Sequence, residues 1–255
     1  MKPTQALKRA AYRLGLDVRR ALPLPKSGAV PSFTDAFHEQ VRLLGRMARP
    51  VIFDAGAHIG QTAVKYKTLF PDAAVYSFEP FEGSFAQLVT AVRGLNDVHP
   101  INSALGRYAG ELTLNVNRST ATNSLLRTDP RASETWNGAD VTDTIGENKV
   151  PVETIDSFLA THPAISTIDI LKIDAQGSEM DILLGARGAL QARRVRLVYL
   201  EIIVLPTYIG QQTLEAYLAF LRGSGFALHN VFNFCYTSDG QLSQLDALFR
   251  SDSST

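Results

Sequence analysis

Four carboxylates in the chain stand where short apolar segments end. They are Asp54, Glu79, Asp174 and Glu201. In an open α/β sheet, ligands bind beyond the carboxyl ends of the strands. A single strand-end acid can be no more than a solvated cap, but four acids at one edge of a sheet predict a functional site.

The turn after the first of these acids contains mostly small residues. In DAGAHIG, residues 54–60, Gly56 and Gly60 lack side chains, so that a ligand can approach the backbone and the N–H groups of the following helix. Glu79 follows Gly60 by about twenty residues, the offset of a carboxylate that binds two ribose hydroxyls. The pattern predicts a cofactor with an adenosine moiety.

The turn differs from the dinucleotide fingerprint, because it lacks the middle glycine that admits a pyrophosphate. Asp54 would repel a pyrophosphate but suits an ammonium group. S-adenosylmethionine combines ribose, adenine and a cationic amino-acid tail, so it is the favoured cofactor. No tyrosine is followed four residues later by lysine, which counts against one common dehydrogenase pair.

The surrounding pattern predicts how these acids are positioned. Apolar segments alternate with helical ones from residue 50 onward, which is typical of βαβ units and a parallel sheet. Residues 106–117 alternate like an antiparallel hairpin, and a long polar loop is expected over 118–148. Two closing strands are expected at 226–234 and 243–251.

Composition narrows the function class. The 255 residues carry no net charge, which argues against a nucleic-acid partner. The single cysteine fits a reducing, cytoplasmic location, and the five histidines show no zinc-ligand spacing. Residues 1–31 form a basic extension before the domain expected at 32–255. That extension suits peripheral contact with an anionic membrane, an acidic partner, or simply a surface helix or tail.

Several segments together resemble the FkbM-type S-adenosylmethionine-dependent methyltransferases. They are VIFDAGAHIGQTAVKY, VYSFEPFEGSF, LKIDAQGSEMDILLGA and VYLEI, in this order and spacing. The resemblance implies a class I methyltransferase Rossmann-like fold, α/β, with a seven-stranded mostly parallel sheet, an antiparallel last strand and helices on both faces. It also implies O-methylation of a hydroxyl on a sugar, glycolipid or polyketide-type natural product. Gln176 stands where many members carry Glu.

On this basis the expected cofactor contacts extend around the glycine turn and the next strand ends. They are Asp54, Gly56, Ala57, His58, Gly60, Gln61, Glu79, Pro80, Asn102, Ser103 and Asp174.

A sugar hydroxyl needs a general base, or a metal that lowers its pKa, before it can attack a methyl group. We expect Asp174 to orient the acceptor or act as the base, with Glu201 as the second carboxylate. The alternative is that Asp174 and Glu201 hold Mg²⁺. Lys172 shares a strand face with Asp174. It either pairs with Asp174 or Glu201 and holds that carboxylate in place, or acts through its amine. His58 is a second candidate base, or packs over the cofactor or caps the helix.

Acceptor contacts are expected from Asn123, Ser124 and Tyr208, with Trp136 as a possible stacking surface. Two other function classes stay open. One is an NAD-type nucleotide-binding enzyme, and the other is a non-catalytic adapter with a methyltransferase fold.

Overall fold

The computed structural model describes residues 35–45, 47–132 and 140–252. The basic extension and Trp136 lie outside this part of the chain. The described residues belong to one compact unit, which begins at Asp35. Among them, no helix has the length and apolar character needed to cross a membrane.

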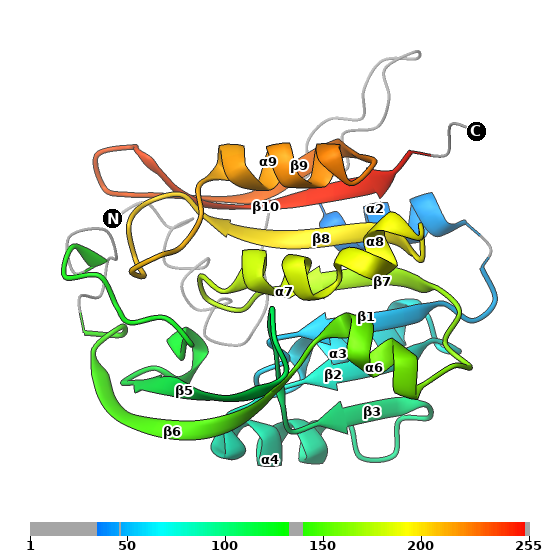
Figure 1. Cartoon of the computed structure of the whole chain (residues 1–255), viewed down its shortest axis with the longest axis horizontal. Helices are drawn as coiled ribbons and strands as arrows, with labels where there is room; N and C mark the ends of the chain where they lie inside the picture. Colours follow the sequence, from blue (N-terminus) through cyan, green and yellow to red (C-terminus); the bar gives the residue numbers. More distant parts are fainter. Residues whose placement is uncertain (1–34, 46, 133–139, 253–255) are drawn as a thin grey trace, which may run out of the picture. The chain divides into compact units, whose positions relative to one another are not determined.

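The core is a seven-stranded sheet in the order β3-β2-β1-β7-β8-β10-β9 (Figure 1). Its strands are β1 (Val51–Ala55), β2 (Ala74–Phe78), β3 (Val98–Ile101), β7 (Ile168–Ile173), β8 (Val195–Ile203), β9 (Phe226–Tyr236) and β10 (Leu242–Ser251). Strands β1, β2, β3, β7 and β8 pair in parallel, whereas β10 is antiparallel to both β8 and β9. The predicted fold class, including its antiparallel last strand, is therefore confirmed.

Helices cover both faces of this sheet, which explains why its central strands are mostly apolar. One face packs against α6 (Ile155–Thr161), α7 (Glu179–Gly185), α8 (Arg187–Gln191) and α9 (Leu214–Gly223). The other packs against α2 (Ala36–Leu44), α3 (Gln61–Leu69) and α4 (Glu82–Ala91). All six residues of β7 are buried.

A second, three-stranded sheet has the order β4-β6-β5. It is built from β4 (Ala104–Leu105), β5 (Gly110–Asn117) and β6 (Thr144–Glu153), with the short helix η1 (Thr120–Thr122) after β5. This sheet lies beyond the carboxyl ends of β1 and β2 (Figure 1). The prediction for this region was wrong in one respect. Residues 106–117 form no hairpin of their own, because β5 pairs with β6 from the far end of the expected loop.

Candidate active site

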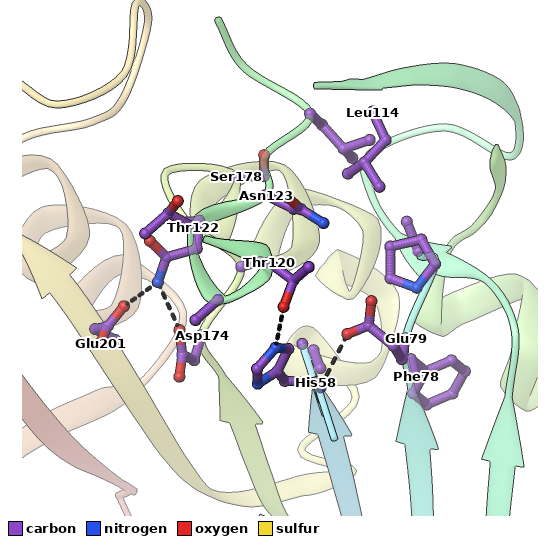
Figure 2. A pocket seen from close by; sticks show the side chains of 18 of the residues that line it. His58, Phe78, Glu79, Leu114, Thr120, Thr122, Asn123, Asp174, Ser178 and Glu201 are labelled. Carbon is purple, nitrogen blue, oxygen red and sulfur yellow. Dashed lines mark hydrogen bonds between the residues drawn. The ribbon is translucent and has the colours of Figure 1, made fainter. Parts of the chain in front are cut away.

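A cavity of about 470 Å³ opens at the carboxyl edge of the main sheet. Its walls come from the ends of β1, β2, β7 and β8, from η1 and its flanking residues, and from the face of α7 (Figure 2). Of the predicted site residues, eight line it: Gly56, His58, Gln61, Glu79, Pro80, Asn123, Asp174 and Glu201. Three of the four strand-end acids thus meet at one cavity.

Glu79 is held by the glycine turn of β1. Its Oε2 accepts a hydrogen bond from the His58 backbone N–H at 2.9 Å, and its Oε1 accepts one from Phe81 N–H at 2.9 Å. Burial raises the pKa of Glu79, although these two backbone donors oppose the effect. The carboxylate is only 7% exposed and borders the cavity, a position that suits binding of a ribose diol.

Asp54, the fourth acid, is not where we expected it. It is fully buried, does not line the cavity, and its Oδ1 lies 2.9 Å from Lys172 Nζ. The strands explain this, because Asp54 and Lys172 are register partners in the β1–β7 pair. The ammonium that neutralises Asp54 is therefore a lysine of the same chain.

Lys172 lies beside Asp174, as one of the two predicted alternatives had it, and it also pairs with Asp54, which was not predicted. Besides Asp54, its Nζ donates to the carbonyls of Ala55 and Gly56 at 3.3 and 3.0 Å, and lies 3.6 Å from Asp174 Oδ2. Burial opposes its charge, but these acids raise the pKa of Lys172 above its ordinary value. A raised pKa keeps the amine protonated, which suits Lys172 to positioning the acids rather than to accepting a proton.

Asp174 and Glu201 form an acid pair bridged by one amide. Gln176 Nε2 donates to Asp174 Oδ1 at 3.0 Å and to Glu201 Oε2 at 2.8 Å. Tyr208 donates its hydroxyl to Gln176 Oε1 at 2.9 Å, which fixes the orientation of the amide. The other oxygen of Glu201 accepts from Gln244 Nε2.

The two carboxyl groups of the pair differ in pKa. Burial raises the pKa of Asp174, but the charge of Lys172 and hydrogen bonds from Glu201 and Gln176 outweigh it and hold the pKa below its ordinary value. Burial, together with the charge of Asp174, raises the pKa of Glu201 well above its usual range. The directions of these two shifts favour the negative charge on Asp174 over Glu201.

This arrangement does not fit Mg²⁺. A hard cation between Asp174 and Glu201 needs oxygen ligands, whereas the point between these carboxylates is occupied by the N–H groups of Gln176. Among the residues that the structure describes, no group of three or more His, Cys, Asp or Glu side chains is arranged to hold a metal ion. Gln176 places an amide between the two acids.

His58 closes the cavity from the turn. Its Nε2 lies 2.9 Å from Thr120 Oγ1, in the segment that forms the opposite wall (Figure 2). Burial holds the pKa of His58 below its ordinary value, so the ring is neutral at pH 7. Its backbone also fixes Glu79, which explains the left-handed φ of 49° at this position.

Two glycines of the turn are required by close packing. A Cβ at Gly56 would lie 1.8 Å from the backbone oxygen of Asp174, and one at Gly60 would lie 3.0 Å from a Leu88 side-chain atom. Both have positive φ, 73° and 93°. They are needed for a tight turn packed against β7 and α4, and only Gly56 lines the cavity.

The other predicted contacts support the walls without lining them; these are Ala57, Asn102, Ser103, Ser124 and Tyr208. Asn102 holds the turn after β2 through the carbonyls of Glu79 and Pro80, and Ser103 bonds to Pro151 O. Ser124 donates to Gln176 O at 2.6 Å, so its hydroxyl is already used.

Sequence reasoning missed several lining residues. Most are apolar or lie in the segment between β5 and β6: Phe78, Ala104, Leu105, Leu114, Thr120, Thr122, Leu125, Val141, Ser178, Ile182 and Gln244. Gln244 could have been predicted from one feature of the expected fold. An antiparallel last strand beside β8 begins at the sheet edge where Glu201 lies, and Gln244 is near the beginning of that strand.

Comparisons with known proteins identify the family to which the chain belongs. The family model described as the methyltransferase FkbM domain matches residues 54–228, more than half of the chain. "Methyltransferase 1" of Beauveria bassiana (strain ARSEF 2860) is 27% identical over 143 residues. That alignment covers 52% of this chain and 57% of the relative, so the chain spans little more than half of that protein. "2-O-methyltransferase NoeI" of Sinorhizobium fredii (strain NBRC 101917 / NGR234) is 24% identical, over 75% of this chain and 79% of the relative.

Among solved structures, precorrin-6y C5,15-methyltransferase from Geobacter metallireducens GS-15 has a TM-score of 0.47 at 10% identity, covering 90% of this chain and 94% of that one. The fibrillarin pre-rRNA processing protein of Methanococcus jannaschii has a TM-score of 0.48 at 12% identity, covering 86% and 76%. The family match, extending over the glycine turn, the acid pair and most of the sheet, shows that this chain belongs to the FkbM family of S-adenosylmethionine-dependent methyltransferases.

Proposed function

We propose that the protein transfers the methyl group of S-adenosylmethionine to a hydroxyl of a sugar, glycolipid or polyketide-type natural product. The observation that carries this proposal is the Asp174–Glu201 pair, which borders the same cavity as the ribose-binding candidate Glu79. The name of one relative, a 2-O-methyltransferase, supports oxygen as the acceptor atom. The zero net charge favours a small molecule or glycan over a nucleic acid.

The cavity residues fit the cofactor in chemistry as well as in size. Glu79 offers acceptors for two ribose hydroxyls, beside an apolar wall that includes Phe78, Ala104 and Leu105. Gly56, His58, Gln61 and Pro80 complete the predicted contacts that border this space. When bound, S-adenosylmethionine supplies the electrophilic methyl group.

Asp174 acts as the general base in this proposal. A hydroxyl loses its proton as its oxygen attacks, so a carboxylate that is charged at neutral pH and borders the cavity is suited to accept that proton. Lys172 and Gln176 hold Asp174 in place and keep it ionised, while Glu201 orients the acceptor. His58, joined to Thr120, helps to exclude water.

Two wider assignments belong to the same proposal. The protein acts in the cytoplasm, and residues 1–31, rich in Lys and Arg, allow peripheral contact with an anionic membrane. Removing residues 1–25 is expected to leave cofactor affinity unchanged, as measured by calorimetry.

The function is tested by methyl transfer from labelled S-adenosylmethionine to a panel of saccharides, glycolipids and phenolic polyketides. We expect a methyl ether on one acceptor class, identified by mass spectrometry, and loss of transfer in Asp174→Asn. Methyl transfer to nitrogen or carbon instead of oxygen would contradict the proposal. So would the finding that the protein binds the cofactor but methylates none of these acceptors.

A further inference from the structure

A second cavity, of about 400 Å³, lies at the edge of the main sheet opposite to the candidate active site. Its floor is formed by the buried side chains of Val195 and Leu197, at the beginning of β8, and Ser251 lines it from the end of β10. Figure 1 shows these strand ends on the side of the sheet away from the small sheet. Val195 precedes Glu201 by six residues of strand, or about 20 Å. This space, the amino-edge groove, is therefore separate from the active-site cavity.

Three arginines line the amino-edge groove: Arg193, Arg196 and Arg250. Asp252 is the only acid among its described lining residues. Arg250 has no hydrogen bond or ion pair with any described residue. Arg196 uses only its Nε, 2.8 Å from Asp169 Oδ1, and Arg193 uses only one Nη, which donates to Asp252 O at 3.2 Å. Within the described chain, most of the guanidinium N–H groups are thus available to an anion.

The opposite wall of the groove is apolar. It is formed by Leu43 and Leu44 in the last turn of α2 and by Met47 after it, all of them half-buried. Thr167 and Ser251 add two hydroxyl groups to the lining. Guanidinium groups bind phosphate through paired hydrogen bonds. A phosphate that carries an apolar chain therefore fits both walls, whereas a phosphate alone leaves the α2 wall uncovered.

Charge argues against the chain's own basic extension as the occupant. Residues 1–31 contain seven Lys and Arg residues but one acid, Asp17, so the three arginines would repel this segment. The extension and the groove favour the same kind of partner, and α2 begins five residues after the extension ends. An anionic bilayer offers phosphate groups and acyl chains together at one surface.

We propose that the amino-edge groove binds an anionic phospholipid of a membrane surface, with its phosphate on the three arginines and the beginning of an acyl chain on the α2 wall. The inference goes beyond the proposed function and does not depend on methyl transfer. It gives the folded domain a membrane contact of its own, in addition to the basic extension. Binding at this edge leaves the active-site cavity accessible from the other edge.

The first test is sedimentation of the full chain with vesicles of phosphatidylcholine that contain about one third phosphatidylglycerol. Arg250→Gln should lower the partition coefficient about 5-fold, the effect of one cation near an anionic surface. Arg127→Gln is the matched control, because it removes the same charge from an exposed position outside the groove. It should bind these vesicles as the wild type does. Vesicles of phosphatidylcholine alone should bind the wild type weakly.

The second test is calorimetry with two soluble probes, dihexanoylphosphatidylglycerol and inorganic phosphate. The wild type should bind the short-chain lipid at least about 10-fold more tightly, since two buried methylene groups suffice for that difference. Met47→Gln keeps the length of the side chain but makes it polar. It should weaken the lipid by about 3- to 10-fold and leave the affinity for phosphate unchanged.

Each outcome decides for or against the groove. Equal binding of the wild type to vesicles with and without phosphatidylglycerol would overturn the proposal. If Arg250→Gln binds acidic vesicles as well as Arg127→Gln does, the basic extension alone accounts for binding and the groove assignment is wrong. Inorganic phosphate bound as tightly as the short-chain lipid would contradict the lipid assignment. None of these measurements uses a methyl donor or acceptor, so failure here is distinct from failure of the proposed function.

Discussion

Lys172 Nζ lies 2.9 Å from Asp54 Oδ1 across the β1–β7 pair, and both side chains are almost wholly buried. This ion pair sits directly beneath the acid pair of the cavity, since Lys172 is also 3.6 Å from Asp174 Oδ2. Lys172 thus links the buried Asp54 to Asp174, which borders the cavity.

Replacing Lys172 with Met should destabilise the fold. Asp54 would be left as an uncompensated buried carboxylate, and breaking one side of a buried pair costs about 3 to 5 kcal/mol. Urea unfolding measures the decrease in the free energy of unfolding. Lys149→Met, at an exposed position of β6, is the control. Adding Asp54→Asn to Lys172→Met should recover part of the stability. If the single variant is as stable as the wild type, the ion pair does not have the role assigned here.

Asp174→Asn should separate catalysis from binding. The amide keeps the shape of the side chain but cannot accept the acceptor's proton, so kcat should fall by roughly 10²- to 10⁴-fold. Affinity for S-adenosylhomocysteine should change little, because Glu79 and the apolar wall remain. Activity close to that of the wild type would remove Asp174 from the role of base.

Gln176→Leu should shift the acid limb of the pH dependence of kcat/KM to higher pH. Hydrogen bonds from Gln176 help to lower the pKa of Asp174, so their loss raises that pKa. Because the base works only when deprotonated, the acid limb of kcat/KM should move to higher pH, by roughly one unit for a hydrogen bond of about 1.5 kcal/mol to a charged group.

None of the titratable groups that interact with Asp174 is changed in this variant. They include Lys172, Glu201, His58, Asp54, Glu179, Tyr208 and Asp246. Gln212→Leu, on an exposed position, is the control for this substitution. An unshifted acid limb in Gln176→Leu would show that the amide does not set the ionisation of the base.

Glu179 should make the protein less stable as the pH rises. Burial raises its pKa to about 7, although backbone N–H groups of Ala175 and Gly177 donate to its Oε1. The folded state then holds a proton that the unfolded state has lost, so stability falls between about pH 4.5 and pH 7. The full effect is about 3 kcal/mol.

Glu179→Gln keeps an oxygen for both backbone donors and carries no charge. It should therefore be more stable than the wild type at pH 8, and its unfolding free energy should depend less on pH. Asp181→Asn, exposed on the same helix, provides the comparison. The assignment is contradicted if the pH dependence of the wild type and of Glu179→Gln is the same.

Most of the architecture could be predicted from the sequence because its signals are local. The apolar strands, the alternating helices and the turn at DAGAHIG each lie in one short segment. The acids Glu79, Asp174 and Glu201 could be assigned to one cavity because parallel strands end at a common edge. Asp54 was placed wrongly, since its partner Lys172 becomes visible only when β1 is known to pair with β7.

The rest of the site depends on contacts between distant segments. Gln244 reaches Glu201 only because β10 inserts between β8 and β9. Ser124 and Tyr208 are polar residues in irregular segments, which resemble acceptor contacts until their hydrogen bonds to Gln176 are seen. The pairing of β5 with β6 lies across a long polar insertion that carries no periodic pattern.

The central claim is that the cavity at the carboxyl edge of the sheet holds S-adenosylmethionine with its methyl group facing Asp174. A crystal structure with S-adenosylhomocysteine tests it most directly. The account predicts the ribose hydroxyls within hydrogen-bond distance of Glu79 and the sulfur directed toward the Asp174–Glu201 pair. A ligand bound elsewhere, or bound here with its sulfur turned away from these acids, would contradict it.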